Sequence, residues 1–170
     1  ATAGKAIYTT TDGTLRIYKN NSTHKMRFVG GNDIMGFELL LNAGLLNTRC
    51  AAIIDSGRRH FCIGEDDIYV HGGSREVEYP IEEKDKQYLY ADMDTTNYLN
   101  GFAFDNPAYK EAWFAYPTSG QTYPNKALVW NYLTKRTTFR DFNGLSADLG
   151  TYTDSLGGTW NASTPSWDSQ

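Results

Sequence analysis

The sequence has 170 residues, of which 40% are hydrophobic, 14% aromatic and 21% charged. This composition is typical of a folded, β-rich protein and excludes a disordered chain. The formal net charge of −4 argues against a site that grips nucleic acid, because such a site needs clustered Lys and Arg to neutralise phosphates. No apolar run approaches the length of a membrane span, and the first fourteen residues lack the pattern of a signal peptide. We therefore expect no membrane anchor.

The N-terminal region, residues 1–48, predicts an arm followed by a hairpin. Small and polar residues fill positions 1–14 and indicate a loose strand or an arm. The segments LRIY at 15–18 and KMRFV at 25–29 flank a polar turn, which is the pattern of a hairpin. Residues 30–47 have a crowded apolar centre between glycines, and this pattern fits a strand as well as a short buried helix.

A first series of four strand signals follows at short spacing. The segments are RCAAII (49–54), RHFCI (59–63), DIYVH (67–71) and REVEY (75–79). We expect Glu65 and Asp66 to form the tip of the central hairpin. Phe61 then faces Val70, and that whole face of the pair is apolar. The other face carries His and Cys side chains in alternation, so the two faces of this hairpin are clearly distinguished.

A second series of four strand signals lies between residues 101 and 142. The segments are GFAFD (101–105), EAWFAYP (111–117), KALVWNY (126–132) and TTFRDF (137–142). Four consecutive antiparallel strands form a meander, the unit from which propeller blades are built. With 134–135 at the tip of the last hairpin, Trp130 lies opposite Phe139, and Leu128 lies opposite Asp141. An aromatic cross-strand pair of that kind stabilises a sheet by roughly 0.2–1 kcal/mol.

Two segments lack a strand pattern. Residues 80–94 begin with Pro80 followed by acidic residues, which predicts a short helix that links the two series. Residues 143–170 are rich in Ser, Thr, Gly and Asp with isolated Tyr and Trp. They predict an extended C-terminal arm that needs a partner surface.

The sequence thus predicts an all-β fold of antiparallel, four-stranded, blade-like sheets: a β-propeller-like fragment with one short helix and an extended C-terminal arm. Its regions are the N-terminal part (1–48), two blade-like units (49–142, joined by 80–94) and the arm (143–170). Two blades cannot close a propeller, which typically has four to eight. We therefore expect the chain to be stable only in a homo-oligomeric ring or as part of a longer polypeptide.

One candidate metal site emerges from the first series. His60, Cys62 and His71, with Cys50 as a further member, are of the types that bind Zn²⁺, and His60 and His71 are cross-strand neighbours. Structural zinc sites carry closely spaced Cys or His pairs, and this sequence has none. The favoured interpretation is therefore a half-buried face on which His and Cys pack. We expect no metal.

An enzymatic interpretation finds little support. Glycoside hydrolysis needs two carboxylates across a cleft, and the candidates are Glu65, Asp66, Asp67, Asp92, Asp94 and Asp141. The first three lie at a predicted hairpin tip, and Asp92 and Asp94 at a helix end, where acids commonly form turns and caps. Neither a nucleophile-elbow motif nor a phosphate-binding glycine loop is present. We expect no catalytic residues and no cofactor.

Several of these segments together resemble a known family. They are EDDIYVHGG (65–73), EAWFAYP (111–117), KALVWNY (126–132) and RDF (140–142), followed by GTW (158–160) and SWDS (166–169). In this order and spacing they resemble the propeller region of the nozzle (tail tubular B-type) proteins of short-tailed phages. The resemblance covers roughly residues 45–170. The family often has a Trp about where Thr137 stands, so the packing of the last hairpin differs here.

The resemblance implies a structural role in a virion. Family members assemble as a ring at the distal end of the phage tail, below an adaptor ring, and DNA leaves through the central channel without specific binding. The implied partners are further copies of the chain and other tail proteins, namely the adaptor and fibres. The acidic balance suits a channel wall that does not retain DNA. Assembly in the bacterial host cytoplasm implies reduced thiols at Cys50 and Cys62.

The relative position of the two cysteines depends on the length of one turn. A three-residue turn at 55–57 would place Cys50 directly opposite Cys62, whereas a two-residue turn would offset them. Two cysteines in this length are too few for a disulfide scaffold.

An alternative function is a carbohydrate-binding or receptor-recognising β module, with Trp113, Trp130 or Trp160 as stacking platforms. Exposure separates the two functions, because a sugar platform faces solvent whereas a core residue is buried. A glycosidase is a third alternative, which requires two facing carboxylates in one cleft.

Overall fold

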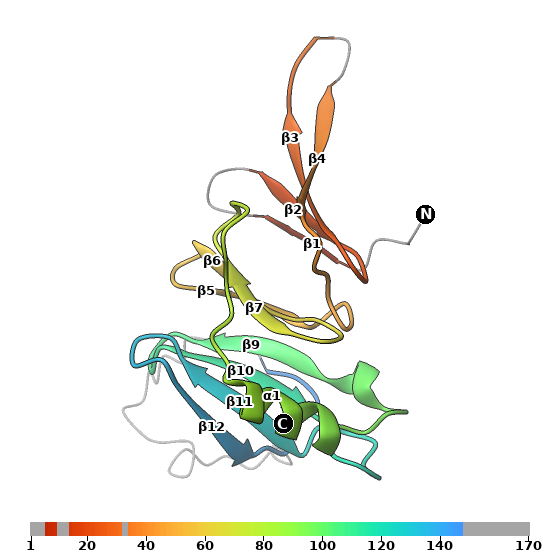
Figure 1. Cartoon of the computed structure of the whole chain (residues 1–170), viewed down its shortest axis with the longest axis vertical. Coiled ribbons are helices and arrows are strands. Elements are labelled where there is room, and N and C mark those ends of the chain that lie inside the picture. The colour runs from red at the N-terminus through yellow and green to blue at the C-terminus, as the bar shows by residue number, and fades with distance from the viewer. Residues whose placement is uncertain (1–5, 10–13, 32–33, 148–170) are drawn as a thin grey trace, which may run out of the picture.

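A computed structural model describes residues 6–9, 14–31 and 34–147, and it contains three antiparallel sheets of four strands each (Figure 1). The first sheet consists of β1 (Ala6–Thr9), β2 (Leu15–Tyr18), β3 (Thr23–Phe28) and β4 (Met35–Leu41). The second consists of β5 (Ala51–Ile54), β6 (Arg59–Ile63), β7 (Ile68–His71) and β8 (Val77–Glu78). The third consists of β9 (Phe102–Asn106), β10 (Glu111–Tyr116), β11 (Lys126–Asn131) and β12 (Arg136–Asp141). Every sheet has its strands in chain order, as the two predicted four-strand series led us to expect for the second and third sheets.

The three sheets are stacked, with the second between the other two (Figure 1). Their first strands converge. The hydroxyl of Tyr8 in β1 donates to the carbonyl of Ala51 in β5 at 3.2 Å, and the amide of Ala103 in β9 donates to the carbonyl of Arg49 at 2.8 Å. The β3–β4 hairpin instead projects away from the stack (Figure 1). Convergence at the first strand of each sheet is the arrangement of propeller blades, and the described sheets form no closed ring.

The second sheet packs through both of its faces. The predicted hairpin register is confirmed: Phe61 pairs with Val70, and His60 with His71. The apolar face points to the third sheet, where Phe61 stacks on Trp130. The opposite face points to the first sheet, where Tyr18 contacts both histidines. The buried residues on the two sides of this sheet belong to one continuous core cluster, and the alternation in β6 and β7 decides which side each residue faces.

The N-terminal region forms the complete first sheet, where an arm and a hairpin were expected. The LRIY segment is β2, and β3 begins at Thr23, two residues before its predicted start. The ambiguous segment 30–47 contains a strand, β4, which pairs with β3 from Met35 to Leu41. β1 has the sequence AIYT, a short run of strand-forming residues inside an otherwise small and polar segment, and it pairs with β2.

The register of the last hairpin differs from the prediction by two residues. Trp130 lies opposite Thr137, and not opposite Phe139 as predicted. Leu128 takes Phe139 as its partner, where Asp141 was expected. A shift of two keeps each side chain on its predicted face, so the sheet itself is as expected.

Asn131 sets this register. Its side-chain oxygen accepts hydrogen bonds from the amides of Leu133 (3.1 Å) and Thr134 (2.9 Å). Its carbonyl accepts from the amide of Lys135, which has a left-handed φ of 59°. The connection 132–135 is therefore a four-residue loop that begins earlier in the chain than the predicted tip.

The turn between β5 and β6 also has four residues, 55–58, so neither predicted turn length was right. Three of these residues have positive φ. Cys62 lies opposite Ala51, and the Cys50 carbonyl accepts from the amide of Ile63 at 2.9 Å. Both cysteines are buried, and no disulfide joins them.

The predicted linker contains the helix α1 (Glu83–Asp92), and η1 (Tyr98–Asn100) follows it. The Tyr88 ring meets Phe139 of β12 edge-on, with centroids 4.7 Å apart. Lys86 bonds Asp67 beside the second sheet at 3.0 Å, so the helix contacts both sheets. Within the described ranges, no helix has the length and apolar character needed to cross a membrane. Most of the predicted C-terminal arm, 148–170 with Trp160 and Trp167, lies outside the described residues.

Candidate functional site

The candidate metal ligands lie at the junction of the first and second sheets. His60, Cys62 and His71 share the face that points to β2, and the two imidazole centroids are 5.4 Å apart. The hydroxyl of Tyr18 lies 2.6 Å from Nδ1 of His60 and 2.7 Å from Nε2 of His71. One nitrogen of each ring is thus occupied by a tyrosine from the other sheet.

The hydrogen bonds assign the protons on both rings. The amide of Gly73 donates to Nδ1 of His71 at 3.3 Å, so His71 carries its proton on Nε2 and donates it to the Tyr18 oxygen. Tyr18 has one proton and donates it to Nδ1 of His60. His60 therefore carries its own proton on Nε2, which has no hydrogen-bond partner among the described residues. The result is a directed chain that crosses from one sheet to the other.

This cluster is chemically poised to stay uncharged. Burial lowers the pKa of His60 to about 4, and burial with the neighbouring His60 and Arg16 lowers that of His71 to about 3. Burial also raises the pKa of the Cys62 thiol to about 12, whereas zinc binds the thiolate. In the part of the chain that the structure describes, no group of three or more His, Cys, Asp or Glu could hold a metal. The hydrogen bonds of Tyr18 to His60 and His71 join the first sheet to the second.

Most of the candidate acids have structural partners, and some of them lie together. Glu65 and Asp94 line one pocket, and Glu65, Asp66 and Asp67 line another. Asp94 accepts from the amides of Thr96 (2.9 Å), Asn97 (2.7 Å) and Gly120 (2.8 Å). These backbone bonds, that of Gly120 first, hold the pKa of Asp94 below its ordinary value. Asp94 therefore closes a turn, one of the two roles expected for acids at this helix end.

Asp92, at the end of α1, anchors the helix to the third sheet. It accepts from Lys126 Nζ at 2.8 Å and from the Tyr116 hydroxyl at 3.1 Å. Asp141 lies on β12 opposite Lys126. Both acids thus occupy a different part of the molecule from Glu65 and Asp66, which lie in the β6–β7 turn.

The tryptophans proposed as sugar platforms are engaged in packing. Trp130 is fully buried, which excludes it as a platform. Trp113 is half-buried, with Phe104 stacked beside it at 5.6 Å and the Arg140 guanidinium over its ring at 5.2 Å. Trp160 lies outside the described residues.

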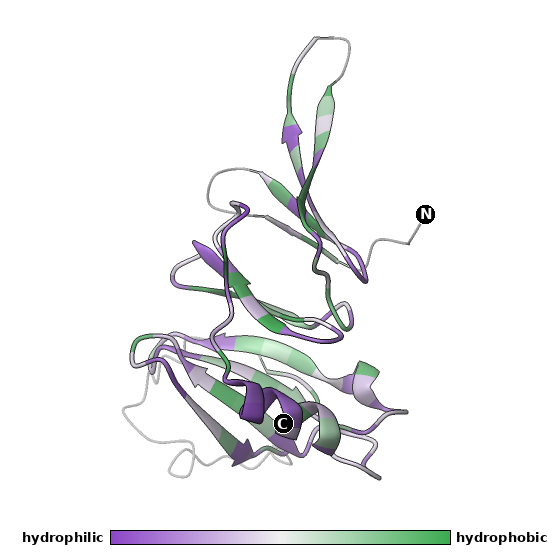
Figure 2. Ribbon diagram, viewed as in Figure 1, coloured by the Kyte–Doolittle hydropathy of each residue, from purple (hydrophilic) through white to green (hydrophobic). Residues whose placement is uncertain are grey.

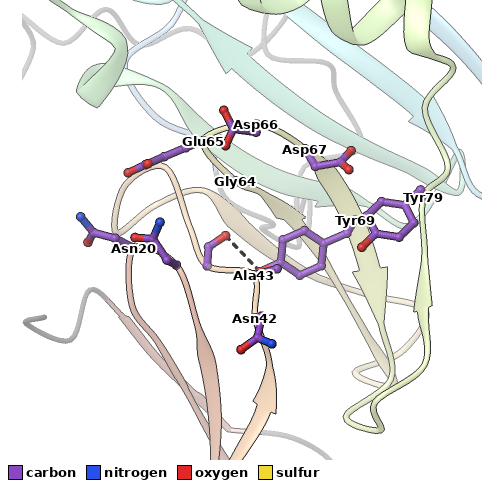
Figure 3. Close-up of a pocket in the computed structure, with 11 residues that line it drawn as sticks. Asn20, Asn42, Ala43, Gly64, Glu65, Asp66, Asp67, Tyr69 and Tyr79 are labelled. Atoms are coloured by element: carbon purple, nitrogen blue, oxygen red, sulfur yellow. Dashed lines mark hydrogen bonds between the residues drawn. The ribbon is translucent and has the colours of Figure 1, made fainter.

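A polar pocket of about 220 Å³ opens where the first two sheets meet (Figure 3). Three turns line it: 20–21 between β2 and β3, 42–44 between β4 and β5, and 64–67 between β6 and β7. Tyr69 lies at its wall, and Tyr79, just after β8, completes it. The amide, carboxylate and tyrosine side chains come from segments up to sixty residues apart, so no local motif could have predicted the site.

Close backbone approaches fix the shape of this pocket. A Cβ on Gly44 would lie 2.1 Å from the carbonyl oxygen of Lys19, and one on Gly64 would lie 3.0 Å from that of Asp67. The Tyr69 hydroxyl donates to the Gly44 carbonyl at 3.0 Å. The walls are therefore backbone segments in close contact. Only glycine fits at position 44, and a side chain at position 64 would require the neighbouring backbone to shift.

The first sheet presents an apolar face away from the second sheet. We call it the outer apolar face. Cross-strand pairing places its side chains on one surface, and they are Ile7, Leu15, Ile17, Met26, Phe28, Met35, Phe37 and Leu39, with His24 among them. Phe28 is 72% and Phe37 66% exposed. Figure 2 shows hydrophobic residues along the projecting β3–β4 hairpin. Met26 and Phe28 flank Arg27, and Met35 and Phe37 flank Gly36. This spacing of apolar residues at every second position is the sequence signal for this face.

Comparison with known proteins gives no relative from which a function could be transferred. No protein-family model matches the chain, and no curated protein sequence matches it significantly.

Proposed function

We propose that this chain is a structural component that works by assembly, as a virion protein of the tail nozzle of a short-tailed phage. In this proposal it forms a homo-oligomeric ring around the DNA exit channel. The observation that carries the assembly is the outer apolar face of the first sheet. The identity as a tail protein rests on the resemblance of its strand sequences to nozzle proteins.

The outer apolar face is large enough to form a protein–protein interface. Its five most exposed side chains, Ile7, Phe28, Met35, Phe37 and Leu39, are between 45% and 72% exposed. Together they present about 500 Å² of apolar surface, and contiguous patches of several hundred Å² mark interaction sites. Matched by an equal area on a partner, the face would bury about 1,000 Å², which is the lower limit for a specific interface.

The chemistry of the face favours another protein surface. It contains no Lys, Arg, Asp or Glu, so a partner sheet could cover it without burying an unpaired charge. The sheets of this chain already pack face to face twice, and a third contact of the same kind would continue the stack. Three described blades are fewer than the four to eight of a closed propeller. Closed rotational symmetry repeats such a contact without open-ended growth.

The strand sequences support the nozzle assignment. The segments 111–117 and 126–132 that resemble nozzle proteins supply two neighbouring strands of the third sheet, β10 and β11. The net charge of −4 suits a channel wall past which DNA moves. The partners in this proposal are copies of the chain, an adaptor and fibres, with assembly in the bacterial host cytoplasm.

The experiment compares the association state of three proteins by light scattering after size exclusion. The wild-type chain should form a closed oligomer, and electron micrographs should show a ring with a central channel. The double variant Phe28→Glu/Phe37→Glu should be monomeric. Arg27→Glu is the matched control, because Arg27 is exposed on the opposite face of the same strand, and it should still assemble. A wild-type chain that stays monomeric at its highest soluble concentration contradicts the proposal.

A further inference from the structure

The polar pocket between the first two sheets carries an inference that is independent of assembly. We propose that it binds an uncharged monosaccharide unit, such as the terminal residue of a glycan. The pocket is preformed, because its walls are backbone segments in direct contact at Gly44 and Gly64. The Tyr90 hydroxyl also donates to the Gly64 carbonyl at 3.0 Å. A preformed site needs little ordering when a ligand enters.

Unused hydrogen-bonding groups surround the pocket. Within the described residues, no hydrogen bond engages the side-chain amides of Asn20, Asn21 or Asn42. Each amide offers two donors and one acceptor oxygen. Adjacent hydroxyls on a sugar ring each donate and accept, so they match amides that can do both.

An aromatic ring lies beside these amides. Tyr79 lines the pocket and is 58% exposed (Figure 3). The negative face of an aromatic ring attracts the C–H groups on one side of a sugar. Tyr79 therefore takes the platform role that the sequence had suggested for tryptophan. An exposed ring next to convergent polar groups is the combination that a polyhydroxylated ligand requires.

The charge of the pocket selects among sugars. Glu65, Asp66 and Asp67 line it, and the nearby Lys86 is shared between Asp67 at 3.0 Å and Glu83 at 2.9 Å. The local field is thus negative, which repels phosphorylated, sulfated and acidic sugars. The volume of about 220 Å³ is below the roughly 300–1,000 Å³ of pockets for drug-sized ligands, so it suits one sugar ring.

A metal ion is a poorer occupant. The carboxylates of Glu65, Asp66 and Asp67 point in different directions (Figure 3). They belong to no metal-binding group found among the described residues.

The test uses saturation-transfer NMR with the full chain and a panel of uncharged sugars: glucose, galactose, mannose and N-acetylglucosamine. N-acetylneuraminic acid and glucose 6-phosphate are the charged comparisons. At least one uncharged sugar should bind with a dissociation constant in the millimolar range, and the charged ones should not. Tyr79→Ala should weaken binding at least tenfold. Tyr109→Ala, which removes another exposed ring, in the β9–β10 turn, should leave binding unchanged.

Asn42→Ala provides a second variant that removes one amide without touching the ring, and a severalfold loss is expected. Saturation transfer to no uncharged sugar, or binding that survives Tyr79→Ala in the folded protein, overturns the inference. Equal binding of the charged sugars overturns it as well. The same titration on Phe28→Glu/Phe37→Glu should give unchanged affinity, so the outcomes for the pocket and for assembly are read separately.

Discussion

Phe61 of β6 lies stacked on Trp130 of β11, with the ring centroids 5.8 Å apart and the planes inclined by 16°. Both side chains are fully buried. The indole Nε1 of Trp130 has no hydrogen-bond partner among the described residues, and the Lys135 ammonium lies 5.0 Å from the centre of its ring. This contact joins the second sheet to the third.

Removing the Trp130 ring should therefore destabilise the fold strongly. We expect Trp130→Ala to lower the free energy of unfolding by about 3–5 kcal/mol, as for other large core truncations. Trp130→Phe should cost less, because it retains a ring and removes a buried N–H without a partner. Urea denaturation followed by circular dichroism measures both. Leu133→Ala, at an exposed position in the adjacent loop, should change stability by less than about 0.5 kcal/mol. A similarly small change for Trp130→Ala would refute this account of the junction.

The His60–Tyr18–His71 chain should make stability depend on pH. The ordinary histidine pKa is 6.5, and burial lowers it to about 4 for His60 and to about 3 for His71. Between these values the unfolded chain binds more protons than the folded one, so stability falls as the pH falls from about 6.5 towards 3. For His60 alone the shift corresponds to about 3 kcal/mol. The two histidines should lower the urea midpoints between pH 7.5 and about 4, against an opposing contribution from Asp105, whose pKa is raised by burial to about 6.

The other groups that face these rings do not offset this effect. Arg16 is cationic and opposes protonation, whereas Tyr8, Tyr18, Cys62 and Tyr69 have pKa values raised by burial and stay neutral. Tyr18→Phe should destabilise the fold by about 1–3 kcal/mol at pH 7, because both rings lose a buried partner. The His24→Ala control should keep the wild-type pH dependence. Asp105→Asn removes the opposing carboxyl, so midpoints of that variant that do not change down to pH 4 would contradict the prediction.

Both cysteines should be protected from reagents until the protein unfolds. Cys50 and Cys62 are fully buried, and burial raises the Cys62 pKa to about 12, which removes the reactive thiolate. Titration with a thiol reagent should give little reaction in the native protein at pH 8. Under denaturing, non-reducing conditions it should give two thiols per chain. Finding none would mean that the cysteines are oxidised.

Residues 148–170 should be dispensable for the three sheets. The described core clusters draw their residues from segments up to Ala147, which packs with Phe102 and its neighbours on the third sheet. A chain ending at Ala147 should still unfold cooperatively in urea. We expect it to assemble less well, because Trp160 and Trp167 are predicted to insert against a neighbouring subunit or a missing domain. Trp160→Ala/Trp167→Ala in the full chain should reproduce the loss. A truncated chain without cooperative unfolding would disprove the first part of this prediction.

The sequence predicts a hairpin register correctly only where both strands alternate. In β6 and β7, apolar side chains such as Phe61 alternate with His and Cys, so one register satisfies both faces. In β11, nearly every side chain is buried, and alternation gives no guide. The decisive information lies in Asn131, whose side chain closes the loop, and in the left-handed Lys135. Turn chemistry of this kind is present in the sequence but is compatible with more than one loop length.

The candidate site was less accessible to prediction than the fold. Its platform Tyr79 and its amides Asn20 and Asn42 come from three separate connections, and they meet only because the first two sheets pack together. Neither the spacing of these residues in the sequence nor their types predict a pocket. The metal hypothesis arose because cross-strand pairing does bring His60 and His71 together. Their partner is not a metal but Tyr18, which lies on β2 of the first sheet.

Because each sheet consists of four consecutive strands, nearly all strand pairing is between neighbours in the chain. Short sequence separations reduce the entropic barrier to folding, and domains can form in order as the chain leaves the ribosome. The first sheet would then emerge with both faces uncovered, and its inner face would be covered as soon as β6 and β7 follow. Its outer apolar face would stay uncovered throughout synthesis. During expression this face is where premature aggregation should begin, and charged substitutions there should increase the soluble yield.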